Sequence, residues 1–455
     1  MEKVIRYKEE ERKENQERTS CYKGEGLLLE EIYNPALTPP FQFAYFLKPE
    51  DPLPIPEEKY EDVVNGKVIY PLNDANIEKG IVRLPSMAEE YGDDKTLISE
   101  IRSFIHKYVE VDELFEKLSS YYVLLTWIYD CFDVVPYLRV IGDTGVGKTT
   151  FLKTVGSICY KPIFCAGAIT SAPIFRFIEM YHGTLIIDEA DFRRSDGYEE
   201  IVKILNCGYT KGMPVLRCRE NKSFFPDGYD CFSPKLIATR NTFQDPALES
   251  RCITYQMKGR EKDDIPLILP PEFYQEALTI RNKLLLWRLR NYKERKIDTT
   301  LIIKGIEDRL NQISLPLLSI INNEDFRDEL GLFIWEYNQK LIKERGMTTE
   351  AEVIETIADL VKDGNLGPTI KEITEKYNEK YAVSEKSKIT PKKVGAIIRR
   401  LNIETKQGSD GYYHIIYNQK EFEKIQSRFS LIPFREVREV RKSENEPEID
   451  SEQRI

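Results

Sequence analysis

The sequence lacks the features that mark several classes of protein. Its eight cysteines are scattered and include no C-x-x-C pair, which argues against a zinc ribbon and against a disulfide framework. The most apolar stretch, 121–138, is broken by Asp130 and Asp133 and falls short of the roughly 20 apolar residues that cross a bilayer. No secretory signal is visible at the N-terminus. We therefore expect a soluble cytoplasmic protein with reduced thiols.

The chain also has no excess of positive charge. Its 66 Lys and Arg residues stand against 76 Asp and Glu residues, a net charge of −10. Affinity for nucleic acid therefore needs a local basic cluster and does not follow from the whole composition. Internal repeats are absent, and outside the motifs below no acid cluster has the spacing of a primase-type metal site.

The order of expected elements indicates an α/β protein of two or three domains, which 455 residues can accommodate. Strands and helices alternate from 137 to 258, which is typical of a parallel sheet with crossover helices. The expected strands are 137–141, 163–165, 184–188, 236–239 and 253–256. The expected domains are a strand-rich N-terminal region of unassigned role (1–94), an α/β core (95–270), a helical lid or linker (271–345), a compact C-terminal domain (346–420) and a tail (421–455), disordered from about residue 442.

The first strand of this sheet leads into a phosphate-binding motif. The sequence G-D-T-G-V-G-K-T at 142–149 matches G-x-x-x-x-G-K-[ST] at each required position. Such glycines let backbone N–H groups wrap a phosphate, and the following helix N-terminus favours negative charge. We expect Lys148 to reach the β- and γ-phosphates of ATP and the Thr149 hydroxyl to hold Mg²⁺. The expected nucleotide-binding residues are Gly142, Asp143, Thr144, Gly145, Val146, Gly147, Lys148, Thr149 and Thr150.

A second strand ends in two acids, Asp188 and Glu189. The carboxyl ends of parallel strands form the edge at which α/β proteins bind ligands. Asp188 is placed to hold the Mg²⁺ shell with Thr149, and Glu189 to polarise the attacking water. Because the acids accompany the phosphate motif, the sequence predicts ATP hydrolysis and not binding alone.

Two more polar residues follow the next strand. Asn241 would lie between Asp188 and the phosphate loop and sense the γ-phosphate, although an ordinary turn residue is the alternative. Arg251 precedes the last strand and faces away from its own nucleotide, so it could reach only a neighbouring subunit as an arginine finger. This position predicts an oligomer, and a ring closes head-to-tail contacts.

With these residues in place, the central region, 95–295, resembles the AAA+ ATPases. Within them it is similar to the replicative helicases of mobile elements, which are distantly akin to the minichromosome maintenance helicases. The resemblance rests on 142–149, 185–191, 236–241 and 247–251.

The resemblance implies two further features. A lid arginine would act as a second sensor, with Arg281 preferred over Arg288 and Arg290. A hairpin before the sensor strand would enter a central pore and grip single-stranded DNA, with candidate contacts at Arg217, Arg219 and Lys222. A surface hairpin with solvated charges is the alternative. The interval between the phosphate motif and the two acids is too short for the extra hairpin insertion of the minichromosome maintenance helicases.

The C-terminal domain shows the element order of a winged helix. Three helices (350–362, 369–381 and 390–401) precede a hairpin (403–406 and 412–417), and in this fold the third helix enters the major groove. Thr390 can cap that helix and Pro391 suits its first position.

The third helix and its flanks are locally basic. From 384 to 406 seven basic residues oppose two acids, a local charge of +5 (7 − 2). The expected DNA contacts are Lys388, Lys392, Lys393, Arg399, Arg400 and Lys406. A solvated face or a protein-binding winged helix is the alternative.

The sequence thus predicts a P-loop AAA+ parallel-sheet ATPase with a helical lid, a small N-terminal domain and a C-terminal winged helix. The predicted function is an ATP- and Mg²⁺-dependent DNA helicase or translocase, a hexameric ring that replicates a mobile or viral element. It would hold single-stranded DNA in its pore and duplex at the winged helix. Two alternatives stay open: an initiator or loader that remodels a nucleoprotein complex without unwinding, and an ATP-gated regulator, against which Glu189 and Arg251 count.

Overall fold

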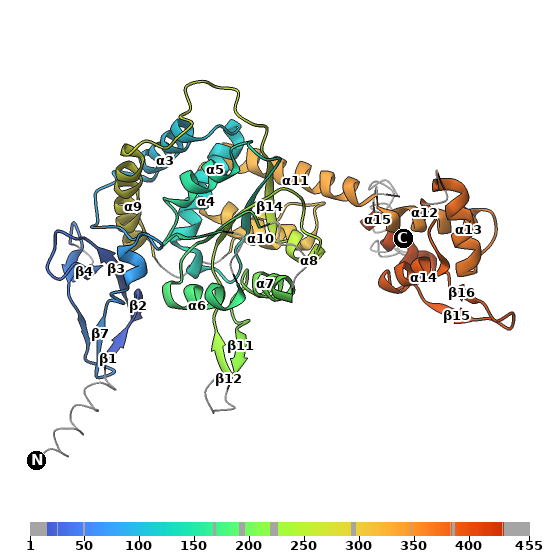
Figure 1. Ribbon diagram of the computed structural model, residues 1–455, viewed down its shortest axis with the longest axis horizontal. Coiled ribbons are helices and arrows are strands. Elements are labelled where there is room, and N and C mark those ends of the chain that lie inside the picture. Colours follow the sequence, from blue (N-terminus) through green and yellow to red (C-terminus); the bar gives the residue numbers. More distant parts are fainter. Residues whose placement is uncertain are drawn as a thin grey trace, which may run out of the picture. The chain divides into compact units, whose positions relative to one another are not determined.

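A computed structural model describes residues 16–24, 26–48, 51–166, 170–190, 196–218, 226–292, 297–346, 348–382, 384, 387–429 and 431 (Figure 1). The chain divides into two compact units, Met1–Leu332 and Phe333–Ile455, which are described separately. No described helix combines the length and the apolar character needed to cross a bilayer.

The first unit is built on a parallel sheet of five strands, as expected. The strands in spatial order are β14 (Cys252–Gln256), β8 (Tyr137–Ile141), β13 (Lys235–Thr239), β10 (Leu185–Asp188) and β9 (Ile163–Ala166). Each neighbouring pair is parallel. The residues of β8 and β13 are buried throughout, as in strands covered on both faces. This arrangement is consistent with a P-loop ATPase core.

Helices surround this sheet (Figure 1). They are α3 (Asp94–Tyr108), α4 (Glu113–Trp127), α5 (Lys148–Gly156), α6 (Ser171–Tyr181), α7 (Asp196–Cys207), α8 (Pro246–Glu249) and α9 (Glu272–Asn291), with a short 3-10 turn η1 (Tyr129–Cys131). Asp93 and Asp112 cap α3 and α4 by accepting hydrogen bonds from backbone N–H groups of the first turn. Helix α4 is buried along most of its length, and the Tyr122 hydroxyl donates to the carbonyl oxygen of Lys235 at 2.8 Å. The helix is thereby fixed to the centre of the sheet.

The N-terminal region contributes two small sheets. One has the order β1 (Gln16–Arg18), β7 (Lys67–Tyr70), β6 (Tyr60–Asp62), and the other β2 (Cys21–Gly24), β3 (Leu27–Tyr33), β4 (Phe41–Tyr45), β5 (Ile55–Glu57), followed by helix α2 (Ala75–Glu78). Glu30 of β3 is 1% exposed, and it pairs with Arg288 of α9 at 2.6 Å and with Lys161 at 2.9 Å. Arg288 also pairs with Asp130 of η1 at 2.8 Å. This buried charge network joins the N-terminal strands to the helices around the five-stranded sheet.

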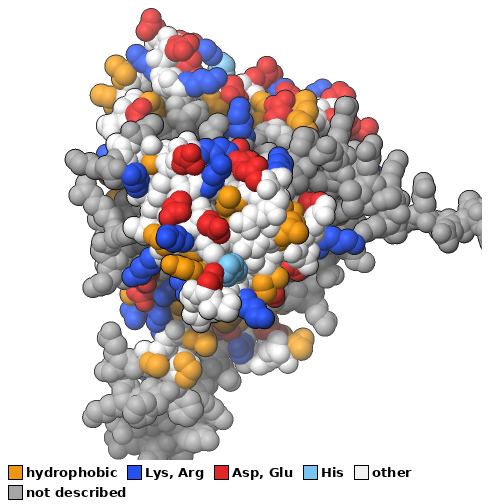
Figure 2. Space-filling model, turned by 90° about the vertical axis from the view of Figure 1, so that its right-hand side faces the viewer, with side chains coloured by type: hydrophobic (Ala, Val, Ile, Leu, Met, Phe, Trp, Pro, Cys, Tyr) orange, Lys and Arg blue, Asp and Glu red, His pale blue; other side chains and the backbone are white. Residues whose placement is uncertain are grey.

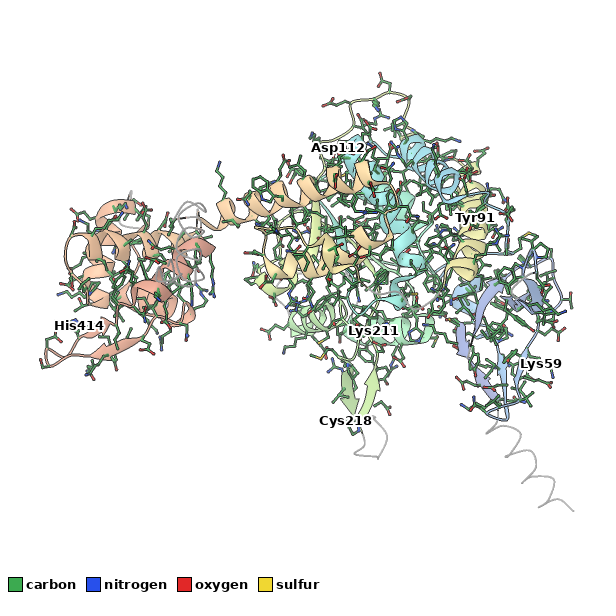
Figure 3. The ribbon with its side chains drawn as sticks, turned by 180° about the vertical axis from the view of Figure 1, so that it is seen from behind. Lys59, Tyr91, Asp112, Lys211, Cys218 and His414 are labelled. Atoms are coloured by element: carbon green, nitrogen blue, oxygen red, sulfur yellow. The ribbon has the colours of Figure 1, made fainter. Side chains whose placement is uncertain are left out.

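A two-stranded hairpin extends from the core (Figures 1 and 3). Its antiparallel strands are β11 (Val215–Cys218) and β12 (Pro226–Tyr229), and Arg217 lies on the first of them. Its connecting residues, which include Arg219 and Lys222, lie outside the described residues. After α9 the first unit continues with η2 (Thr299–Leu301), α10 (Asp308–Ile320) and the start of α11 (Glu324–Gly346).

The second unit follows the expected order of three helices and a hairpin. These are α12 (Thr349–Lys362), α13 (Ile370–Tyr381), α14 (Pro391–Arg400), β15 (Thr405–Gln407) and β16 (Tyr413–Ile415). Thr390 caps α14 through the backbone N–H of Lys393, and Pro391 stands at the first position, as predicted. One helix was not expected: α15 (Gln419–Arg428) buries Phe422 and Ile425 in the core of this unit. The compact part of the unit therefore extends beyond residue 420.

Candidate active site

The phosphate motif forms the turn between β8 and α5. Gly145 and Gly147 have φ angles of 87° and 91°, in the left-handed region that glycine adopts most readily. Gly147 is the N-cap of α5, so the first backbone N–H groups of this helix are directed toward the turn. A Cβ at Gly142 would lie 2.9 Å from Cγ2 of Val146, which leaves no room for a side chain. The loop therefore presents backbone donors and needs its glycines, as anion binding requires.

Lys148 lies across this loop. Its Nζ donates hydrogen bonds to the carbonyl oxygens of Gly142 and Asp143, both at 2.6 Å. The ammonium group is thus held over the turn by the loop itself. Asp143, Thr144 and Gly145 are exposed, so the outer side of the turn is accessible.

The two halves of the expected metal site are in contact. Thr149 Oγ1 donates a hydrogen bond to Oδ2 of Asp188 at 2.7 Å. The other carboxylate oxygen of Asp188 accepts the backbone N–H of Glu189 at 2.9 Å. A hydroxyl and a carboxylate oxygen at this distance form a set of hard oxygen ligands of the kind that Mg²⁺ prefers.

Strand β13 separates the phosphate loop from the acidic strand, and backbone hydrogen bonds link it to both. The N–H of Gly142 donates to the carbonyl of Thr239 at 3.3 Å, and the N–H of Ala190 donates to the carbonyl of Ala238 at 2.9 Å. Asn241 follows this strand and is exposed at the same sheet edge, which is the position expected of a γ-phosphate sensor. Thr239 Oγ1 is buried and has no hydrogen-bond partner among the described residues.

Glu189 has a neighbour that the sequence did not single out. Its backbone has φ = 53°, a left-handed conformation uncommon outside glycine, and its carboxylate lies 3.7 Å from the guanidinium of Arg240. Both side chains are largely exposed, at 70% and 54%, so this ion pair contributes little to stability. The only sequence signal for Arg240 was its place beside Asn241 at the end of a buried strand.

Arg251 lies at the opposite end of the sheet from the phosphate loop. Its carbonyl accepts the N–H of Tyr137, the first residue of β8, whereas the loop follows the last residue of that strand. Five residues of strand separate these ends by about 16 Å. Arg251 therefore does not reach its own phosphate loop, as the sequence predicted.

The guanidinium of Arg251 lies over the ring of Tyr209 at 4.4 Å, and its Nε is buried without a hydrogen-bond partner among the described residues. Arg309 of α10 lies over the same ring at 5.1 Å. Two guanidinium groups thus meet at the ring of one tyrosine.

The structure corrects the expectation for Arg281. Its side chain is 6% exposed and Nη1 donates to the carbonyl of Ser157 at 2.7 Å, at the C-terminal end of α5. The phosphate loop is at the other end of that helix, roughly 14 Å away along nine residues. Burial also lowers the pKa of Arg281 to about 9. Arg281 is a packed structural residue because α9 presses it against the end of α5, and it does not sense the nucleotide from this position.

The candidate DNA contacts lie apart from the nucleotide site. In the hairpin, Arg217 forms an ion pair with Glu200 of α7, so its charge is already neutralised. In the second unit the predicted contacts are all exposed: Lys388, Lys392, Lys393, Arg399, Arg400 and Lys406. Arg400 forms an ion pair with Glu350 of α12. On the face shown in Figure 2, lysine and arginine side chains lie among acidic ones and do not form a continuous basic field.

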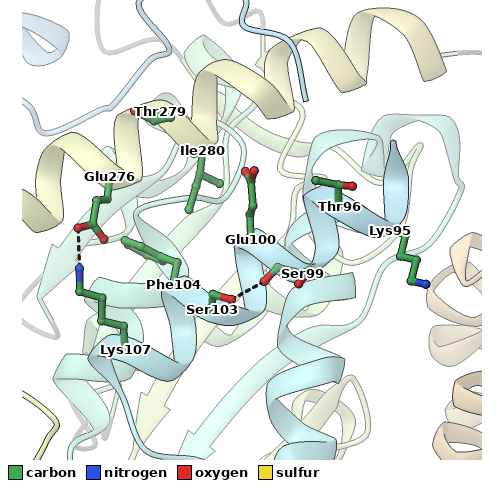
Figure 4. A pocket seen from close by; sticks show the side chains of 10 residues that line it. All are labelled: Lys95, Thr96, Ser99, Glu100, Ser103, Phe104, Lys107, Glu276, Thr279 and Ile280. Atoms are coloured by element: carbon green, nitrogen blue, oxygen red, sulfur yellow. Dashed lines mark hydrogen bonds and ion pairs between the residues drawn. The ribbon is translucent and has the colours of Figure 1, made fainter. Parts of the chain in front are cut away.

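A groove of about 740 Å³ lies between α3 and α9, and Figure 4 shows its lining side chains. Phe104 and Ile280 form its apolar part, and Lys107 pairs with Glu276 at 2.7 Å on its wall. No residue of the phosphate motif lines this groove. We assign it no part in nucleotide binding.

Comparisons with known proteins do not assign this chain to a family. No family model and no curated protein matches the chain. A solved structure described as the active helicase Cch of SCCmec type IV is 11% identical, with a TM-score of 0.42, over 90% of this chain and 80% of that one. The C-terminal region of NrS-1 is 11% identical, with a TM-score of 0.36, over 85% and 96%. The Aeropyrum pernix Orc1 protein in complex with DNA is 16% identical, with a TM-score of 0.23, over 72% and 95%. These TM-scores are below 0.5, so they carry no conclusion about function.

Proposed function

We propose that this chain is an ATP- and Mg²⁺-dependent motor that acts on DNA, a helicase or translocase that works as a ring. The observation that carries the ATPase part is the hydrogen bond between Thr149 and Asp188 beside a glycine turn at a helix N-terminus. A glycine turn, a lysine, a hydroxyl and a carboxylate at one edge of the sheet support the binding of ATP phosphates and a hard cation.

The residues at this edge of the sheet have different roles in ATP hydrolysis. The N–H groups of the turn and Lys148 bind the β- and γ-phosphates, while Thr149 and Asp188 supply oxygen ligands to Mg²⁺, which neutralises charge on the phosphates when bound. Glu189, exposed next to Asp188, orients and polarises the attacking water. Asn241 contacts the γ-phosphate from the end of β13.

The oligomer is proposed from the position of Arg251. Since it lies at the far end of β8 from its own loop, it can stabilise transition-state charge only in a neighbouring subunit. Repeated head-to-tail contacts of this kind close into a ring, for which six subunits is our proposal.

The DNA contacts are proposed from the second unit and the hairpin. The second unit has the helix and hairpin order of a winged helix, and Lys392 and Lys393 at the start of α14 are exposed without an ion pair to a described residue. We propose that α14 binds duplex DNA through its phosphates. The β11–β12 hairpin is the candidate contact for single-stranded DNA in the ring. Replication of a mobile or viral element is the setting proposed for this activity.

One observation favours a second candidate, a loader or initiator that does not unwind DNA. Arg217, the described basic residue of the hairpin, forms an ion pair with Glu200. Its guanidinium is therefore less available to bind DNA phosphates than an unpaired arginine would be. A hairpin that contacts a protein would have no need of free cations.

The deciding experiment measures steady-state ATP hydrolysis with and without single-stranded DNA, and unwinding of a forked duplex, with particle size followed in parallel. The motor proposal expects DNA to stimulate ATP hydrolysis and the assembled ring to separate the fork. Stimulation without strand separation would favour the loader. ATP hydrolysis by a monomer indifferent to DNA would contradict both.

A further inference from the structure

A buried lysine stands at the first position of β13. The side chain of Lys235 is 0% exposed, and no described carboxylate forms an ion pair with it. Its Nζ donates three hydrogen bonds, to the carbonyl oxygens of Gly208 at 2.7 Å, Cys231 at 2.8 Å and Ser233 at 2.8 Å. Burying an ammonium group without a counter-ion is unfavourable, and the burial lowers the pKa of Lys235 to about 7. Packing alone therefore does not explain why a lysine occupies this buried position.

The three carbonyl groups lie just before and just after the β11–β12 hairpin in the sequence. Gly208 directly follows α7, before the β11–β12 hairpin, and Cys231 and Ser233 follow that hairpin. The N–H of Ser233 also donates to the carbonyl of Gly208 at 3.1 Å. The ammonium group therefore closes the base of the hairpin from inside the sheet.

Gly208 is fitted to this arrangement. A Cβ there would lie 2.4 Å from Nζ of Lys235 and 2.5 Å from the carbonyl oxygen of Cys231. Because the backbone approaches the ammonium this closely, only glycine leaves the three hydrogen bonds undisturbed.

The other end of β13 belongs to the nucleotide site. Thr239 accepts the N–H of Gly142 in the phosphate loop, and Ala238 accepts the N–H of Ala190, next to the catalytic acids. Between its ends the strand is buried and hydrogen-bonded to β8 and β10 on its two sides. A strand held in this way moves as a unit, so a shift at one end reaches the other.

We propose that Lys235 is a positioning residue that anchors the base of the β11–β12 hairpin to the strand that borders the nucleotide site, so that changes at the γ-phosphate move the hairpin. The inference rests on the proposed function, since the hairpin is there taken to contact single-stranded DNA. It adds the connection through which hydrolysis would act on that contact. Arg217, which pairs with Glu200 of α7, holds the hairpin from a second side.

The test compares Lys235→Met with Lys161→Met. Lys161 is an equally buried lysine, 1% exposed, whose Nζ donates to the carbonyl of Ser20 at 2.6 Å and pairs with Glu30, away from the hairpin. The two changes remove the same group, so a loss of stability common to both is separated from an effect on the hairpin. Basal ATP hydrolysis, its stimulation by single-stranded DNA and amide hydrogen exchange are measured for each variant.

We expect Lys235→Met to keep basal ATP hydrolysis within about twofold of wild type and to lose its stimulation by DNA. Amide exchange in residues 209–230 should rise by about tenfold or more, while exchange in β8 and β14 stays as in wild type. Lys161→Met should change neither the stimulation nor the hairpin exchange. Gly208→Ala, which keeps the lysine and disturbs its hydrogen bonds, should reproduce Lys235→Met in milder form and serves if that variant does not fold.

Unchanged hairpin exchange in the folded variants would overturn the anchor. Faster exchange with full DNA stimulation would overturn the coupling. If DNA fails to stimulate wild type, the proposed function fails, and hairpin exchange alone then decides whether Lys235 is the anchor.

Discussion

The hydroxyl of Thr149 donates a hydrogen bond to the carboxylate of Asp188 at 2.7 Å, across 39 residues of sequence. Thr149 lies in the first turn of α5, which follows β8 and the phosphate loop, and Asp188 ends β10. Strand β13 lies between β8 and β10. In the proposed function, these two side chains supply oxygen ligands to Mg²⁺.

Thr149→Ala and Asp188→Asn should each lower Mg²⁺-dependent ATP hydrolysis by about two to three orders of magnitude. The first change removes an oxygen ligand, and the second removes the negative charge of the carboxylate. A Mg²⁺ titration at saturating ATP measures the loss. Thr96→Ala changes an exposed threonine of the α3–α9 groove and is the control. Equal activity of Thr149→Ala and the control would contradict the assignment.

Glu189→Gln should lower the turnover of ATP by about 10² to 10⁴-fold, because the amide cannot accept a proton from the attacking water. ATP should still bind to this variant. Arg240→Ala should change the rate by no more than about threefold, since its pair with Glu189 is exposed. Single-turnover hydrolysis and nucleotide binding are measured on both. Normal turnover by Glu189→Gln would exclude it as the base.

If Arg251 acts in a neighbouring subunit, two inactive variants should restore activity to each other when they are mixed. Lys148→Ala cannot bind the phosphates and Arg251→Ala cannot supply the guanidinium, so each variant alone should be inactive. Mixed one to one, they should recover about a quarter of wild-type activity, because half of the sites are intact and half of their neighbours carry the arginine. Particle size is checked to show that both variants assemble. A mixture as inactive as its components would contradict action between subunits.

Lys392→Ala with Lys393→Ala should weaken duplex DNA binding and reduce the slope of log K against log salt by about 1.8, since each phosphate contact contributes about 0.9. Arg400→Ala should have less effect, because Arg400 is paired with Glu350. Lys424→Ala, an exposed lysine of α15, is the matched control. An unchanged slope in the double variant would exclude α14 from the interface.

Glu31 predicts a pH dependence of stability. It is 0% exposed, its Oε2 has no partner among the described residues, and burial raises its pKa to about 7. Between its ordinary value of 4.5 and about 7 the folded chain binds more protons at this group than the unfolded chain does. The stability contributed by Glu31 therefore falls as pH rises through this window. Glu31→Gln, which resembles the protonated acid, should flatten the fall in melting temperature between pH 5 and 7, and an unchanged slope would contradict the assignment.

The sequence predicted best those features that depend on residues close to one another along the chain. The five strands, the phosphate turn and the N-cap of α14 follow from residues close in sequence, and the structure has them within about one residue. Arg240 and Lys235 escaped notice because their partners come from other segments, and no periodicity reports such contacts. Arg281 was misjudged for the same reason, since its burial against Ser157 depends on how α9 packs. Helix α15 was missed because it is highly charged and buries only Phe422 and Ile425.

The pairing of Glu30 with Arg288 has a consequence for synthesis of the chain on the ribosome. The two residues are 258 positions apart, so the N-terminal strands emerge long before the arginine that neutralises their buried acid. Before Arg288 is made, the described partners of the Glu30 carboxylate are the Tyr160 hydroxyl and the Lys161 ammonium group, and these also lie far downstream of it. The first strands to be made are therefore among the last to reach their native environment, and a ribosome stalled before residue 288 would hold a nascent chain whose N-terminal sheet is not yet secured.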